Sequence, residues 1–111
     1  MGVTKTNLFT KKQNDLARLA KAIAHPARIA ILDHLIASNS CINSDLVEET
    51  GLAQATVSQH LRELKEAGFI KGNIEGSSMC YCIDPVQWSR VEQTFTLFFN
   101  RYKASEDVRC C

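Results

Sequence analysis

Hydrophobic residues recur at helical spacing along most of this chain, which predicts a mainly helical protein. Thr10-Lys11-Lys12-Gln13 has the form of a capping box and starts a first helix. Pro26 ends that helix and suits the first turn of a second one. The apolar positions expected to face the core are Leu16, Leu19, Ala20 and Ile23 in the first helix and Ile29, Leu32, Leu35 and Ile36 in the second.

Two further helices joined by a tight turn are predicted over about 43–67, in the form of a helix-turn-helix. The first covers about 43–50 and is broken by Gly51, and the second covers about 54–67 and is ended by Gly68. The second helix has apolar residues at i, i+4 and i+7, namely Val57, Leu61 and Leu64.

The pattern then changes to the alternation of strands. Phe69–Ile74 and Met79–Ile83 are expected to pair through a Gly-containing turn, which gives a hairpin, or wing, over about 69–83. In the second strand Cys80 and Cys82 are expected on one face, opposite Met79, Tyr81 and Ile83.

Asp84-Pro85 supplies an N-cap and a first-turn proline for a last helix over about 86–103. Its apolar face is wide and aromatic, with Phe95, Phe98, Phe99 and Tyr102. The expected fold is therefore a single domain over 1–111, mainly α with a small β-hairpin.

Composition places limits on this protein without indicating its role. A chain of 111 residues can bury one modest core, and its apolar stretches are too short to span a membrane. The polar start of the chain lacks the features of a secretory signal, so a cytoplasmic location is expected. The net charge is only +1, and the six Lys and Arg residues against one Asp within residues 1–28 are explained as well by a solvated helix face.

Three stretches resemble the arsenical-resistance repressor (ArsR/SmtB) family of regulators. They are 21–32 (KAIAHPARIAIL), 52–64 (LAQATVSQHLREL) and 66–70 (EAGFI), within a likeness that covers about 12–102. The resemblance implies a winged helix-turn-helix repressor of double-stranded operator DNA, not an enzyme. Ala53 departs from the family, which often has a capping Ser there, and Lys71 alone replaces the arginines common in the wing.

The polar side of the second helix of the helix-turn-helix is the predicted DNA-binding surface. Gln suits adenine, Arg suits guanine, and hydroxyls contact bases or phosphates, although an ordinary solvated face explains any single residue equally well. His60 leans toward the core and is expected to pack there. The predicted DNA contacts are Gln54, Thr56, Ser58, Gln59 and Arg62, with Lys71 from the wing.

A second subunit is expected, because one helix of this size binds DNA weakly. A symmetric dimer places two such helices in successive major grooves, about 34 Å apart. The helices at both ends of the chain are predicted to form the dimer interface, with the aromatic residues of the last helix facing Leu16, Leu19 and Ile23.

Five cysteines raise the question of an inducer. The zinc site known on the last helix of the family is not expected, because no His follows His60, and Asn43 replaces the second Cys of the family's Cys-x-Cys site. If residues 41–43 pair with the second wing strand, Cys41, Cys80 and Cys82 share one face and suit trivalent arsenic, antimony or another thiophilic ion. Cys110 and Cys111 form a rival pair.

Other interpretations of the cysteines remain open. They are ordinary small apolar residues in many strands. Two of them could instead form a disulfide in a redox or reactive-sulfur sensor. A thiol enzyme or metal-sequestering protein is disfavoured, since no Cys–His–carboxylate set, phosphate-binding Gly loop or closed zinc motif occurs. No obligatory cofactor is expected.

Overall fold

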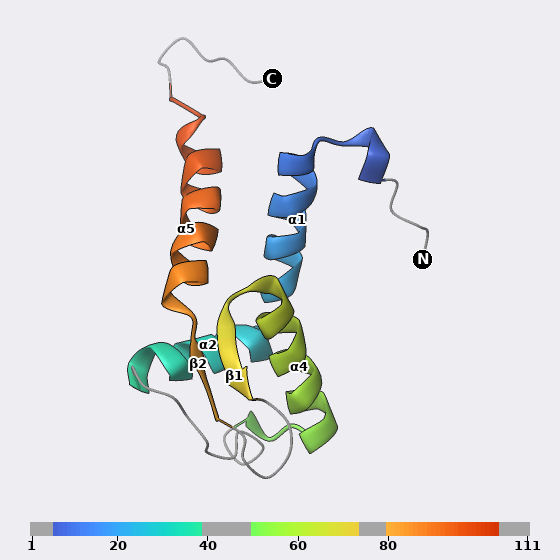
Figure 1. Cartoon of the computed structure of the whole chain (residues 1–111), viewed down its shortest axis with the longest axis vertical. Helices are drawn as coiled ribbons and strands as arrows, with labels where there is room; N and C mark the ends of the chain where they lie inside the picture. The colour runs from blue at the N-terminus through green and yellow to red at the C-terminus, as the bar shows by residue number, and fades with distance from the viewer. Residues whose placement is uncertain (1–5, 39–49, 74–79, 105–111) are drawn as a thin grey trace.

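The computed structural model describes residues 6–38, 50–73 and 80–104 (Figure 1). The predicted helix over about 43–50, except Thr50, and the turn of the hairpin lie outside these residues. The elements are a 3-10 turn (Thr6–Leu8), α1 (Lys11–Ile23), α2 (Pro26–Ser38), α4 (Gln54–Ala67), β1 (Ile70–Asn73), β2 (Cys80–Ile83) and α5 (Pro85–Asn100).

The described helices and the two-stranded hairpin are arranged as in a winged helix-turn-helix domain, as the sequence predicts. In Figure 1, α2, α4 and the hairpin form a compact body, and α1 and α5 extend from it on the same side. No helix in the described part of the chain is long and apolar enough to cross a membrane.

Local hydrogen bonds explain where the helices begin. The Thr10 hydroxyl accepts from the backbone N–H of Gln13 at 3.1 Å, and the Gln13 side chain accepts from the N–H of Thr10 at 3.0 Å. Nδ1 of His25 accepts from the N–H of Ala27 at the start of α2, at 3.0 Å. The Asp84 carboxylate accepts from the N–H groups of Val86 and Gln87 at the start of α5. The predicted caps at Thr10 and Asp84 are confirmed.

The last helix is shorter than the sequence suggests. Its predicted end at about residue 103 is wrong, because α5 ends at Asn100. The N–H of Arg101 donates to the carbonyls of Phe98 and Phe99, and the N–H of Tyr102 donates to the carbonyl of Phe99. These tighter spacings replace the i→i−4 pattern and close the helix.

One hydrophobic core lies between α4, α2 and the hairpin. Its most buried side chains are Ile31, Leu61, Leu64, Ile70 and Tyr81. The expected core stripe of α2 is partly wrong: Ile31 points inward with Leu32 and Leu35, whereas Ile29 and Ile36 are 42% and 52% exposed. The predicted core position Ala20 of α1 is also exposed, and Ala22 is buried instead. Because α2 has apolar residues on more than one side, its pattern alone does not identify the buried face.

The hairpin places its two faces in different surroundings. Lys71 pairs with Cys82, and Asn73 pairs with Cys80, whereas Gly72 pairs with the fully buried Tyr81. Gly72 has a φ of 116°, and a Cβ atom there would collide with the Cys80 carbonyl oxygen. A glycine is therefore required for the two strands to approach at this point.

Candidate nucleic-acid interface

The inner face of α4 fixes the orientation of the whole helix. Val57, His60, Leu61 and Leu64 are buried on that face, and the helix packs against α1, α2 and β1. Each buried aliphatic side chain contributes on the order of 1.5–3 kcal/mol relative to exposure. The polar side of α4 is thereby held outward in one defined orientation.

The C-terminus of α4 is closed by a Schellman motif. Gly68 adopts a φ of 95°, and its N–H bonds the carbonyl of Lys65 at 3.1 Å. The N–H of Phe69 bonds the carbonyl of Leu64 at 3.0 Å, and both side chains belong to the core. This motif sets the angle at which the hairpin leaves α4.

The N-terminus of α4 is less well closed. Ala53 is the N-cap residue, with extended backbone angles and no side-chain hydrogen bond to the first turn. Before it, the Thr50 hydroxyl accepts from the N–H of Leu52 at 3.2 Å, and Gly51 has a φ of 73°. The backbone N–H groups of the first turn, which carry the positive end of the helix dipole, therefore have no side-chain cap from the described residues.

The outward side of α4 carries an ordered set of hydrogen bonds. Arg62 donates to the Gln59 side-chain carbonyl at 3.1 Å, and the Gln59 amide donates to Glu63 at 3.0 Å. Gln54 donates to the hydroxyl of Ser58 at 3.2 Å. The Gln59 amide is thus held from both ends, and the bonds to described residues leave one N–H and one carbonyl lone pair for a base edge.

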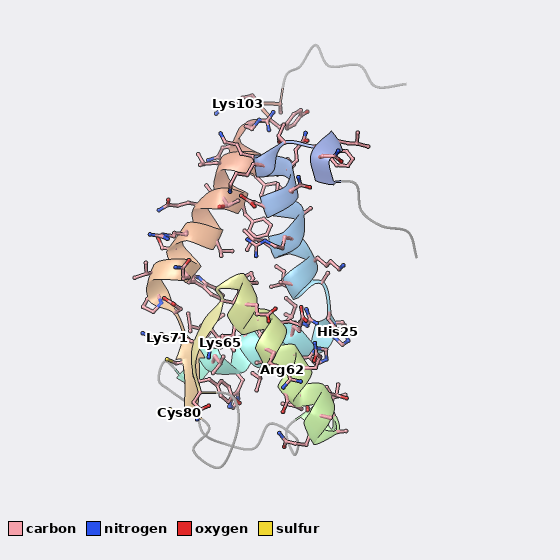
Figure 2. The ribbon with its side chains drawn as sticks, turned by 45° about the vertical axis from the view of Figure 1, so that its right-hand side comes forward. His25, Arg62, Lys65, Lys71, Cys80 and Lys103 are labelled. Atoms are coloured by element: carbon pink, nitrogen blue, oxygen red, sulfur yellow. The ribbon has the colours of Figure 1, made fainter. Side chains whose placement is uncertain are left out.

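The hairpin is fastened to the same side of α4. Nζ of Lys65 donates to the carbonyl of Gly72 at 2.7 Å. In the view of Figure 2, Lys65 lies between Arg62 and Lys71, and Lys71 is exposed on β1. Two ammonium groups and one guanidinium therefore lie along the outward side of α4 and the adjoining hairpin, which we call the recognition side.

The other edge of α4 is held by a buried histidine. Nε of Arg28 donates to Nδ1 of His60 at 2.9 Å, and Nη1 of Arg28 donates to the carbonyl of Ala22 at 2.9 Å. The ring centroids of His25 and His60 are 4.4 Å apart. Burial, followed by the nearby His25 and Arg28, lowers the pKa of His60 below 6.5. A neutral His60 ring is the form that accepts from Arg28. Because His60 is buried, the expectation that it packs in the core is confirmed.

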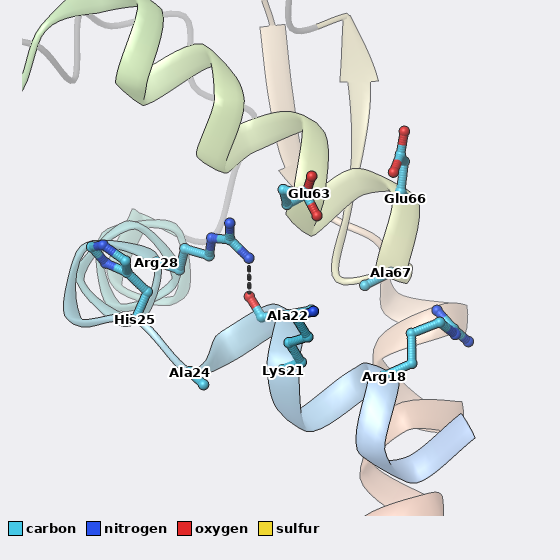
Figure 3. A pocket seen from close by; sticks show the side chains of 9 residues that line it. All are labelled: Arg18, Lys21, Ala22, Ala24, His25, Arg28, Glu63, Glu66 and Ala67. Atoms are coloured by element: carbon cyan, nitrogen blue, oxygen red, sulfur yellow. Dashed lines mark hydrogen bonds between the residues drawn. The ribbon is translucent and has the colours of Figure 1, made fainter. Parts of the chain in front are cut away.

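A cleft of about 790 Å³ opens between α1, the start of α2 and the end of α4 (Figure 3). Arg18, Lys21 and Arg28 line it together with Glu63 and Glu66 of α4. The two carboxylates oppose the basic side chains, so the cleft has no strong preference for an anion. Its structural role is visible in Figure 3, where Arg28 bonds the carbonyl at the end of α1.

The cysteines are only partly described. Cys80 is exposed and Cys82 is half-buried, on the hairpin face opposite Tyr81, as expected. Cys41, Cys110 and Cys111 lie outside the described residues. The described residues contain no group of three or more His, Cys, Asp or Glu side chains arranged to hold a metal ion.

The predicted DNA-contacting residues come together on one side of α4 and the hairpin. Gln54, Thr56 and Gln59 are exposed, Ser58 and Arg62 are half-buried, and Lys71 is exposed nearby. Their contact with DNA stays a prediction.

Three residues with structural roles at this surface were missed from the sequence. Glu63 lies four residues after Gln59, so helical spacing could have indicated that bond. Lys65 bonds Gly72 across the helix end, and Arg28 bonds His60 across 32 positions, which no local pattern indicates.

Comparison with known proteins agrees with this architecture. The family described as "Bacterial regulatory protein, arsR family" matches residues 25–71, which include all of α2 and α4 and the first part of β1. The HTH-type transcriptional regulator MJ1325 of Methanocaldococcus jannaschii is 34% identical over 73 residues, covering 66% of this chain and 82% of that protein. The chain belongs to the ArsR/SmtB family.

Other relatives are similar to the chain over a shorter part of their length. The transcriptional repressor SmtB of Mycobacterium tuberculosis is 41% identical over 63 residues, covering 57% of this chain and 46% of that protein. The regulator Rv0081 of the same species is 36% identical over 67 residues, covering 60% of this chain and 59% of that protein. These matches thus span less than two thirds of those relatives. The crystal structure of Rv0081 superimposes with a TM-score of 0.58 at 26% identity, covering 84% of this chain and 94% of that one.

Proposed function

We propose that this ArsR/SmtB-family protein is a homodimeric transcriptional repressor that binds double-stranded operator DNA through α4. The observation that carries this proposal is the fixed outward side of α4, where Gln54, Gln59 and Arg62 are held by hydrogen bonds beside an uncapped helix start. Oriented amide and guanidinium groups suit base edges in the major groove, and open N–H groups suit a phosphate. Membership of a regulator family supports the same interpretation.

The homodimer is supported by apolar side chains that the single chain leaves exposed. Phe98, Phe99 and Tyr102 at the far end of α5 are 46%, 66% and 70% exposed, and Leu8 and Phe9 before α1 are 68% and 55% exposed. In Figure 1 these two ends lie on the same side of the molecule, away from α4 and the hairpin. An apolar area of this kind is characteristic of a protein interface. A dimer formed there leaves both α4 helices outside the contact.

The proposed inducer is a thiophilic ion, such as trivalent arsenic or antimony, bound by Cys41, Cys80 and Cys82. The exposed and half-buried positions of Cys80 and Cys82 on one strand face support access of an ion to both sulfurs. Cys82 pairs with Lys71 and lies near the Lys65–Gly72 bond, so a change at this strand reaches the recognition side directly. An inducer acts if it binds the conformation that does not bind DNA more tightly.

The proposal is tested with a labelled duplex taken from the DNA upstream of the protein's own coding region. Fluorescence anisotropy at fixed salt gives the affinity of the wild-type chain and of Gln59→Ala and Arg62→Ala. Each substitution is expected to weaken binding to this duplex by about 1–3 kcal/mol and to reduce its preference over random DNA. Equal affinity for the upstream duplex and for random DNA at the same salt concentration would show that the chain is not an operator-specific repressor.

The inducer is tested separately with arsenite, antimonite, zinc and cadmium. Cys41→Ser, Cys80→Ser and Cys82→Ser should each leave DNA affinity intact and abolish release by arsenite, whereas the matched pair Cys110→Ser/Cys111→Ser should still respond. If only the Cys110→Ser/Cys111→Ser pair abolishes release, the ligands are the rival cysteines.

Release by an oxidant without any ion, reversed by a dithiol, identifies instead a disulfide sensor, in which two thiols lose two electrons and two protons to the oxidant. Cα atoms of alternate strand residues lie about 6.6 Å apart, at the upper limit for a disulfide, so such a sensor is expected to use at least one of Cys41, Cys110 and Cys111.

A further inference from the structure

A groove of about 420 Å³ runs between α2 and α5, on a different surface from the recognition side of α4. The α2 wall is formed by residues spaced at i, i+3, i+4 and i+7 (Ile29, Leu32, Asp33 and Ile36). The α5 wall is formed by one helix face that includes Trp88, Glu92, Phe95 and Phe99. Small-molecule sites in proteins are of this size and are mostly apolar with few polar groups.

The polar groups of the groove are all neutral or acidic. Asp33 stands on the α2 wall and Glu92 on the α5 wall, and no Lys, Arg or His is among the described residues that line the groove. Both carboxylates belong to exposed residues, and neither has an ion pair or hydrogen bond with another described residue. A cation placed between the walls would meet a negative charge on both sides.

The aromatic residues favour the same kind of ligand. Phe69 at the floor and Trp88 touch edge to face, with ring centroids 5.9 Å apart, and Phe95 and Phe99 continue along α5. The faces of aromatic rings attract organic cations, and Trp is the best of them. The combination of aromatic rings with carboxylates therefore matches an alkylammonium group that carries an apolar substituent.

We propose that the α2–α5 groove binds a small hydrophobic organic cation. A neutral apolar molecule would gain nothing from Asp33 and Glu92, and an anion would be repelled by both. A helix of a second copy of this chain would cover the carboxylates and, unless it supplied a cation of its own, would bury them unpaired.

The groove also touches the junction that orients the recognition helix. Phe69 directly follows Gly68, its N–H closes the end of α4, and Ile70 begins β1. A ligand that packs against Phe69 and Trp88 is thus in contact with the point where α4 and the hairpin meet. The effect on DNA affinity depends on the proposed repressor function, whereas ligand binding itself does not.

Trp88 is the only tryptophan in the chain and lines the groove, so its fluorescence reports on ligand binding there. The wild-type protein is titrated with benzyltrimethylammonium, with its neutral isostere neopentylbenzene and with phenylacetate. The cation should change Trp88 fluorescence in a saturable manner at concentrations where the other two have little effect. An equal response to the neutral isostere would overturn the proposal.

Substitutions in the groove separate charge recognition from simple apolar contact. Asp33→Asn and Glu92→Gln should each weaken binding of the cation by about twofold to fivefold, as expected for an exposed ion pair, without changing binding of the isostere. Ile36→Arg places a positive charge inside the groove and should weaken binding of the cation by about tenfold or more. Val86→Arg is the matched control, because Val86 lies in α5 and is exposed but does not line the groove. Circular dichroism confirms that each variant folds.

Three further outcomes decide the remaining points. If the Trp88 response to the cation disappears as protein concentration rises into the range where the chain dimerises, a second copy covers the groove and the proposal is wrong. If the cation binds but leaves DNA affinity unchanged, the contact through Phe69 does not couple the groove to α4. A chain that binds the cation but no DNA would contradict the repressor function and leave the ligand site established.

Discussion

His60 illustrates how a single residue connects three helices in this fold. It lies in α4 and is only 6% exposed, accepts from Arg28 of α2, and faces the ring of His25 just before α2. Arg28 in turn bonds the last turn of α1 through the carbonyl of Ala22. Within the described residues, Nε2 of His60 has no hydrogen-bond partner. A proton added to Nδ1 would remove the acceptor of the Arg28 bond and place a second positive charge beside it.

This arrangement makes stability depend on pH. The pKa of His60 is lowered in the folded chain, so between that pKa and 6.5 the unfolded chain binds more protons. The contribution of His60 is fully present above about pH 6.5 and is lost as the pH falls through the folded-state pKa. We therefore expect the free energy of unfolding, measured by urea titration, to decrease between about pH 8 and pH 5.

The conservative substitution His60→Asn tests the origin of this decrease. The Asn side-chain oxygen can take the place of Nδ1 as the acceptor for Arg28 and does not titrate. The variant should lose about 1–2 kcal/mol at pH 8 through poorer packing, and its stability should then fall less steeply with acid than that of the wild type. Parallel curves for the two proteins would assign the acid sensitivity to other groups.

At the scale of elements, α4 has one strong end and one weak end. The C-terminus is closed by Gly68 and the Schellman motif, whereas Ala53 at the N-terminus provides no side-chain acceptor. Ala53→Ser should place a hydroxyl within reach of the first-turn N–H groups and raise the free energy of unfolding by about 1 kcal/mol. Ala53→Val is the control, because Val adds bulk without an acceptor and should not stabilise the protein. Thermal unfolding followed by circular dichroism measures both, and a Ser variant no more stable than the Val variant would contradict the prediction.

The elements were predictable because their ends are determined by local chemistry. Thr10 and Asp84 accept from backbone N–H groups a few positions ahead, and Gly68 takes a left-handed conformation, so each leaves a local mark in the sequence. The buried face of α2 and the end of α5 were not predictable in the same way. Ile29 and Ile31 are equally apolar, and only the packing of α4 and the hairpin against α2 decides that Ile31 is buried.

The candidate site shows the same division. The polar side of α4 follows from its helical period, because Val57, Leu61 and Leu64 determine which side turns inward. The bonds that orient the site, from Lys65 to Gly72 and from Arg28 to His60, join elements that meet only in the folded chain. Their partners could not be identified before the packing was known.

At the scale of the whole molecule, the exposed aromatic end of α5 and the recognition side of α4 lie far apart in Figure 1. A dimer formed through the first can therefore present two copies of the second to one duplex. Binding by two linked modules exceeds binding by one by about 10²–10⁴-fold, because the second contact becomes intramolecular.

The double variant Phe98→Glu/Tyr102→Glu tests this division of roles. Both side chains are exposed in the single chain, at 46% and 70%, so the substitutions should leave folding intact while placing charges in the proposed interface. We expect sedimentation velocity to show a monomer, and operator affinity to fall by about 100-fold or more. Val86→Glu, a change at an equally exposed position near the start of α5, should do neither. A monomeric double variant that keeps full operator affinity would show that a single α4 is sufficient for recognition, whereas an unchanged dimer would locate the interface elsewhere on the chain.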